Sequence, residues 1–191
     1  GALYFTANDG DSELWTSDGT SAGTTKVDLF PGTDGDVPNY TVVLNNVAYL
    51  TANIPSGNNQ LVEWDGINAA EVAENSAGAG VITTTTALTV FDGLIYLYAE
   101  NTTDEPTTGR ELYSYDPTTN EYLLVSDIAA GNANSGISNF TVANGILFFE
   151  ACDTTQLVSL LLIIRWNGIC FLLKLRKPIT KWLSSRICFS I

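Results

Sequence analysis

The sequence predicts an all-β fold and, within that class, an incomplete β-propeller of four-stranded antiparallel blades, each about 45–50 residues long. The first observation is a repeat: an apolar run ending in Ala recurs at Ala7, Ala52, Ala99 and Ala151, spaced by 45, 47 and 52 residues. The second is that the intervening runs are short, rich in Val, Leu, Tyr, Phe and Thr, and bounded by turn-forming residues. The third is that the first 150 residues contain no sustained helical spacing of apolar residues.

Each period contains four such runs, which we interpret as four strands. The runs ending in Ala are LYFTA (3–7), AYLTA (48–52), IYLYA (95–99) and LFFEA (147–151). The second runs are ELWTSDG (13–19), QLVEWDG (60–66) and ELYSYDP (111–117), and the third are TKVDL (25–29), AEVAE (70–74) and LLVSDI (123–128). The runs before the next anchor are NYTVVLNN (39–46), TALTVFDG (86–93) and NFTVANG (139–145). Two hairpins per period are typical of a propeller blade.

The residues between the runs specify tight turns. Asp92-Gly93 and Asn144-Gly145 are pairs that favour type I′ hairpins, because both central residues of that turn need a positive φ. Asn45-Asn46 holds the same place in its repeat. Asp116-Pro117 opens a polar turn between two aromatic-bearing runs. A β-solenoid is the rival architecture, but its connections are not tight hairpins.

The repeats divide the chain into blades. We expect propeller-like repeats over 1–153, with a partial blade over 1–36, blades over 38–75 and 86–128, and a partial blade over 137–151. A closed ring typically needs four to eight blades. The prediction is therefore a fragment that begins inside a blade and whose natural partners include the remaining blades of a longer protein.

Residues 154–191 differ in composition from the rest of the chain. All 21 acidic residues lie at or before Asp153, and all three cysteines lie at or beyond Cys152. The apolar stretch 157–175 is about as long as a spanning helix. Because Arg165 and Asn167 lie near its middle, where polar groups are costly, we expect no membrane span.

An alternative for this tail is translation in a shifted reading frame. Read two nucleotides later, Trp166-Asn167 gives Glu and then Trp for suitable codons, and Arg165 supplies a preceding Val. The result matches Val62-Glu63-Trp64 of the second repeat. The hypothesis is that 154–191 is an aberrant, frameshifted tail, and stop codons in the alternative frame would exclude it.

Composition limits the partners of the remaining part. This part contains all 21 acidic residues and only two basic ones, Lys26 and Arg110, which argues against nucleic acid or anionic membranes, since phosphate binding needs Lys and Arg. The abundance of Thr and Asn with few Lys favours an extracellular or bacterial cell-surface protein. No disulfide framework is used before residue 152.

The sharpest local motif is ELWTSDGTSAGT at 13–24. It resembles the signature of the bacterial ELWxxDGT-repeat family, large secreted repeat proteins of ill-defined role, and the resemblance covers about 1–151. It is strict in the first repeat only: the second keeps Asp65-Gly66, and the third, ELYSYDPTTNEY, is more similar to a kelch-type hairpin. The resemblance implies secretion and propeller-like blades. The alternative to ligand binding is a structural role for the motif. In that case Leu14, Leu61 and Leu112 would pack between blades, and so would Trp15 and Tyr113 at the next position.

Two kinds of binding residue are candidates. Trp15, Trp64 and Tyr115 would stack on sugars if exposed, and would pack in the core otherwise. Asp9, Asp11, Asp34 and Asp36 offer carboxylates to Ca²⁺, which takes six to eight oxygen ligands, although neither acidic turn matches a complete calcium loop. No other cofactor is expected.

Catalysis has few groups available. The chain has no His, its first Cys is Cys152, and no Gly-rich phosphate loop precedes a helix. We therefore expect a non-enzymatic segment for binding or adhesion, with carbohydrate or a surface protein as partner. The alternatives are a fragment of a carbohydrate-active propeller enzyme, which would use paired carboxylates, and a purely structural spacer.

Overall fold

The computed structural model describes residues 1–31, 37–53, 59–72, 82–101, 108–154, 158–166 and 169–176, which form fifteen strands and no helix. The first sheet contains β1 (Leu3–Asn8), β2 (Ser12–Ser17) and β3 (Thr25–Val27), and the second contains β4 (Asn39–Leu44), β5 (Val47–Asn53), β6 (Asn59–Trp64) and β7 (Ala69–Glu71). The third contains β8 (Ile82–Phe91), β9 (Leu94–Asn101), β10 (Arg110–Asp116) and β11 (Glu121–Ser126). The fourth contains β12 (Ser138–Ala143), β13 (Ile146–Cys152), β14 (Val158–Trp166) and β15 (Ile169–Arg176).

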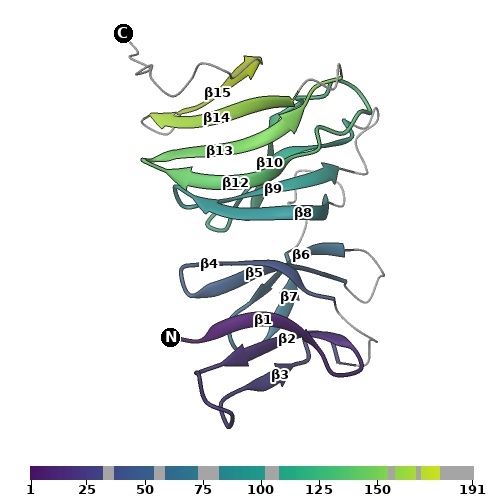
Figure 1. Cartoon of the computed structure of the whole chain (residues 1–191), viewed down its shortest axis with the longest axis vertical. Helices are drawn as coiled ribbons and strands as arrows, with labels where there is room; N and C mark the ends of the chain where they lie inside the picture. The colour runs from purple at the N-terminus through teal and green to yellow at the C-terminus, as the bar shows by residue number, and fades with distance from the viewer. Residues whose placement is uncertain are drawn as a thin grey trace.

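The strands of each sheet follow one another in chain order and pair antiparallel, which is the meander expected of a propeller blade. The second and third groups of strands are joined by the antiparallel pairing of β6 with β8 at Gln60 and Thr83, so together they form one eight-stranded sheet. We describe each group of four strands as a sheet because each forms its own meander. Figure 1 shows the sheets arranged one after another along the molecule in an open series. The predicted fold class, an all-β incomplete propeller with four-stranded antiparallel blades, is confirmed.

The fourth sheet draws two strands from the segment that the sequence sets apart. β14 pairs with β13 from Ile146–Ile164 to Cys152–Val158, and β15 pairs with β14. The backbone of this segment thus occupies the place of the third and fourth strands of a blade. The frameshift hypothesis for 154–191 stays a prediction, because strand pairing does not reveal the reading frame.

The hairpin turns have the backbone conformation that the sequence predicts. Both central residues have positive φ in each of three turns: Asn45 (52°) and Asn46 (66°), Asp92 (49°) and Gly93 (77°), Asn144 (52°) and Gly145 (71°). This is the requirement of a type I′ turn, whose twist matches that of the flanking strands. Each of these turns joins the first and second strands of its sheet, so the predicted hairpins are confirmed.

Apolar side chains fill the space between successive sheets. Leu14 packs between the first and second sheets, Leu61 between the second and third, and Leu112 between the third and fourth. The next residue along each strand points to the opposite face, because side chains alternate along a strand. Val62 therefore packs toward the first sheet and Tyr113 toward the second.

Each sheet thus has two distinct faces. We call the face that packs on the following sheet, marked by Leu14, Leu61 and Leu112, the forward face. The opposite face, which packs on the preceding sheet, is the rear face. The alanine anchors belong to the rear face, since Ala52, Ala99 and Ala151 are buried in the three successive clusters.

Among the described residues, no helix has the length and apolar character of a membrane span.

Candidate functional site

The connection between the third and fourth sheets is fixed by Ser135, which is fully buried. Its backbone N–H donates to the carbonyl oxygen of Arg110 at 3.0 Å, and its Oγ donates to the same oxygen at 3.2 Å. Its own carbonyl accepts the N–H of Cys152 at 2.7 Å. Ser135 therefore joins the start of β10 to the end of β13, two strands in different sheets.

Neighbouring residues hold the same connection in place. The Oδ1 of Asn134 accepts the N–H of Arg110 at 2.7 Å, and the N–H of Gly136 donates to the Tyr98 hydroxyl at 3.0 Å. Gly109 has a positive φ of 68°, and a Cβ there would lie 2.3 Å from the carbonyl oxygen of Ala133. Glycine is therefore required at position 109 by close backbone approach as well as by conformation.

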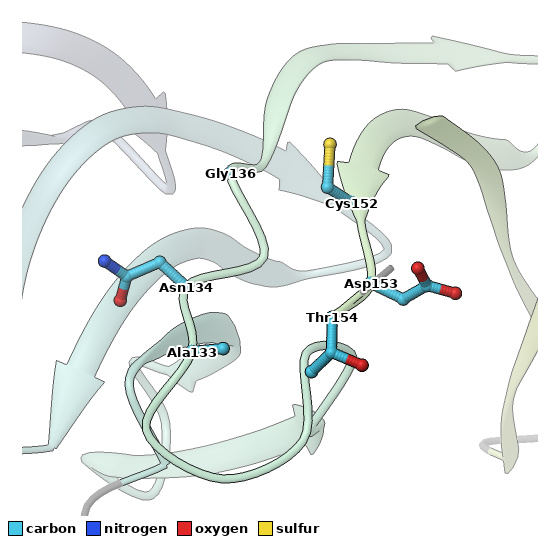
Figure 2. Close-up of a pocket in the computed structure, with 6 residues that line it drawn as sticks. All are labelled: Ala133, Asn134, Gly136, Cys152, Asp153 and Thr154. Atoms are coloured by element: carbon cyan, nitrogen blue, oxygen red, sulfur yellow. The ribbon is translucent and has the colours of Figure 1, made fainter. Parts of the chain in front are cut away.

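A pocket of about 470 Å³ lies beside this connection (Figure 2). Its lining consists of Ala133, Asn134, Gly136, Cys152, Asp153 and Thr154. Cys152 is a half-buried free thiol at the end of β13, and Asp153 is buried beside it. In Figure 2 the Asn134 side chain points away from Cys152, consistent with its bond to Arg110. The lining thus offers one thiol and one carboxylate.

A buried carboxylate lies nearby, on β10. Glu111 is fully buried, and its Oε2 and Oε1 accept the N–H groups of Ile128 and Ala129 at 2.9 and 3.1 Å. Burial raises the pKa of Glu111, although these hydrogen bonds act in the opposite direction. The carboxylate thus hydrogen-bonds the connection after β11 to β10.

The same position is buried in each of the first three repeats. Glu13 and Gln60 are the first residues of the corresponding runs, and both are buried. The repeat pattern alone did not indicate a role for this position. The available signal was a Glu or Gln before the repeated Leu in all three second-strand runs.

Aspartates of the repeat motif cap their own hairpins. The Oδ1 of Asp18 accepts the N–H of Thr20 at 2.9 Å, and the Oδ1 of Asp65 accepts the N–H of Ile67 at 2.8 Å. Asp116 accepts the N–H of Thr118 in the same way, at 2.8 Å. Hydrogen bonding lowers the pKa of Asp18 and of Asp65, with the bonds to Thr20 and to Asn68 as the leading causes. These aspartates therefore stabilise the hairpin turns that follow the strands of the motif.

Two predicted sugar-stacking residues are core residues. Trp64 is 7% exposed and packs edge-on against Tyr4, with ring centroids 5.2 Å apart. Tyr115 is 3% exposed and packs against Tyr49 and Tyr122, and its hydroxyl donates to Asn120 Oδ1 at 2.9 Å. Because both side chains are buried, Trp64 and Tyr115 adopt the core packing that the sequence offered as the alternative to stacking on a sugar.

Trp15 differs from these two residues. It lies on β2 of the first sheet and is only partly buried. Across the strands it pairs with Phe5 on β1 and with Lys26 on β3. The candidate aromatic residues are therefore not brought together at one surface.

Only two of the four predicted calcium ligands lie within the described residues. Asp9 is exposed and forms an ion pair with Lys26, with 3.1 Å between Oδ1 and Nζ, while Asp11 is exposed in the same turn. Asp34 and Asp36 lie outside the described residues. Within the part of the chain that the structure describes, no group of three acidic, Cys or His side chains is placed to hold a metal ion.

The fold and these contacts define the class of protein: an open, propeller-type array of repeated antiparallel sheets. Comparison with known proteins adds little to this class, since no family model and no curated protein matches the chain. Among solved structures, the chain is similar to a polysaccharide lyase described as a new family, an ulvan lyase with a bound saccharide. The TM-score is 0.43 and the identity 12%, over 88% of this chain and 49% of that one. The chain thus spans about half the length of that structure.

Proposed function

We propose that this chain is a non-enzymatic segment of an extracellular repeat protein of the ELWxxDGT type, and that its work is binding or adhesion. One observation carries the proposal: the polar residues of the repeat motif form hydrogen bonds with the chain's own backbone. Glu111 accepts two loop N–H groups, and Asp65 accepts those of Ile67 and Asn68. The motif therefore has a structural role within the blades, and we infer that the exposed turns which it stabilises contact the partner.

These turns form the proposed contact surface. The turn row is our name for three turns: residues 18–21 after β2, residues 65–68 between β6 and β7, and residues 117–120 between β10 and β11. Ile67 is 86% exposed within its Asp65-capped turn. A large apolar side chain on a rigid turn loses little conformational entropy when a partner covers it.

The chemistry of the turn row suits a neutral, hydroxyl-rich partner. Asn68 and Thr119 are exposed, and their amide and hydroxyl groups donate and accept hydrogen bonds as sugar hydroxyls do. The net charge of −13 disfavours a strongly anionic polymer. We therefore favour a neutral surface carbohydrate as the partner class.

The test is binding of the purified chain to an array of neutral and anionic glycans. We expect binding to neutral glycans, and a loss of at least about tenfold for Ile67→Ser together with Asn68→Ala, which corresponds to about 1.4 kcal/mol. Leu123→Ser is the matched control, since Leu123 is exposed on β11 away from the turn row.

The remaining outcomes decide against the proposal. If the chain bound no glycan and no surface polymer, the structural spacer would be favoured. Depolymerisation of a bound glycan, followed as release of shorter chains, would identify an enzyme fragment. Equal loss of binding in Leu123→Ser would show that the turn row is not the contact surface.

A further inference from the structure

The rear face of the first sheet is apolar and only partly covered. Because side chains alternate along a strand, Leu3, Phe5 and Ala7 of β1 share this face, and Trp15 lies opposite Phe5 on β2. Leu3 is 63% exposed, and the other three side chains are partly exposed. Tyr4, between them in sequence, points the other way and packs on Trp64 of the second sheet.

The same repeat positions are covered in the next two sheets. In the third sheet they are Ile95, Leu97, Ala99 and Tyr113, all buried in the cluster shared with the second sheet. In the second sheet they are Ala48, Leu50, Ala52 and Val62, all buried in the cluster shared with the first sheet. In both cases the cover is the forward face of the preceding sheet.

A second observation concerns the Trp15 indole. Its Nε1 is buried and has no hydrogen-bond partner among the described residues. A buried donor without an acceptor destabilises the folded state. The Trp15 side chain is thus held on the rear face with Nε1 buried and only other parts of the side chain open to a covering sheet.

We propose that this rear face, defined by Leu3, Phe5, Ala7 and Trp15, is the docking surface for a further four-stranded sheet of the same repeat. The covering sheet presents its forward face, with side chains equivalent to Tyr49, Leu61 and Val72 of the second sheet. The covering sheet would pack on the first sheet as the second sheet packs on the third.

The first three sheets of a second copy of this chain are poorer occupants. The forward-face leucines of its first three sheets, Leu14, Leu61 and Leu112, are already buried against their own following sheets. A further sheet of the array has its forward face free for the first sheet. The occupant that we propose is therefore a preceding sheet of the array.

The repeat itself supplies the experiment. Residues 38–92 are placed before Gly1, so that a second-sheet copy is followed by a β8 copy and an Asp92-Gly1 turn equivalent to Asp92-Gly93. The matched control places only 82–92 before Gly1, which adds the β8 copy without a covering sheet. Hydroxyl-radical labelling with mass spectrometry then measures the reactivity of Trp15 and Phe5.

We expect the labelling of Trp15 to fall several-fold in the longer fusion relative to the control, at all protein concentrations. Equal labelling in the two fusions, with the added sheet shown to be folded by hydrogen exchange, would overturn the proposal. Protection of Trp15 in the original chain that rises with concentration would also overturn it, since the occupant would then be a second copy.

Discussion

Glu111 shows how a single residue of the motif serves the blade. Its carboxylate is fully buried on β10 and accepts the N–H groups of Ile128 and Ala129, which belong to the connection after β11. These N–H groups lie in a segment that has left the β-ladder, so a side chain must satisfy them. The buried Glu of β10 is therefore explained by the hydrogen bonds that these backbone N–H groups require.

Glu111→Ala should destabilise the protein by about 2 kcal/mol, because two buried N–H groups lose their acceptor. The measurement is the urea unfolding midpoint, with the slope of the transition checked for constancy. Glu121→Ala is the control, since Glu121 is exposed at the start of β11, and its effect should stay within about 0.5 kcal/mol. Equal losses in the two variants would contradict the assigned role.

Glu111→Gln tests the pH dependence of stability. The pKa of Glu111 is raised in the folded state above the ordinary value of 4.5, so the folded protein holds a proton that the unfolded chain releases. The contribution is present below pH 4.5 and is lost as the pH rises through the folded pKa. The unfolding free energy of the native chain minus that of Glu111→Gln should therefore fall as the pH rises above 4.5. A constant or rising difference would refute the raised pKa.

At the scale of the element, the turns follow from local sequence and the strand irregularities do not. The pairs Asp92-Gly93 and Asn144-Gly145 adopt the positive φ angles that their side chains tolerate. The first strands of three sheets also shift register, between Asn39 and Val42, Thr84 and Leu88, and Ser138 and Thr141. A bulge of this kind depends on which residues pair across strands, which a single strand's sequence does not specify.

Asn46→Gly should stabilise the hairpin between β4 and β5. Asn46 has a φ of 66°, a conformation that costs energy for a residue with a Cβ and that glycine adopts freely. The change creates the Asn-Gly pair of the turn at 144–145, and we expect a gain of up to about 1 kcal/mol by thermal or urea unfolding. Gly145→Val is the reverse control and should destabilise the protein, because a β-branched residue is strained at a φ of 71°. No neighbour lies within 4 Å of an added Cβ, so a steric clash would not contribute to the loss.

At the scale of the whole molecule, stability depends on the faces between sheets. Leu14, Leu61 and Leu112 lie in three successive clusters, so each interface depends on side chains of its two sheets. In such an array the total stability approximates a sum of sheet and interface contributions. The uncovered rear face of the first sheet is the exception, and it is the basis of the docking proposal.

Leu61→Ala should cost about 2–5 kcal/mol, because it leaves a cavity between the second and third sheets. Native-state hydrogen exchange should show faster exchange in β6 and in β9–β10, which contribute Leu61, Leu97 and Tyr113 to this cluster. Leu123→Ala, at an exposed position of β11, is the control. Faster exchange in β6 alone would contradict coupling between the sheets.

The sequence alone determined the all-β class, the four-strand period and the tight turns, because strand alternation and turn conformation are set by neighbouring residues. It also placed Leu14, Leu61 and Leu112 between blades. Only the tertiary structure decided that Trp64 and Tyr115 are core residues, whereas Trp15 remains partly exposed. It likewise revealed that Glu111 binds the backbone of a distant connection. The physical reason is that burial and long-range hydrogen bonding depend on which sheet lies against each face, and that arrangement exists only in the folded array.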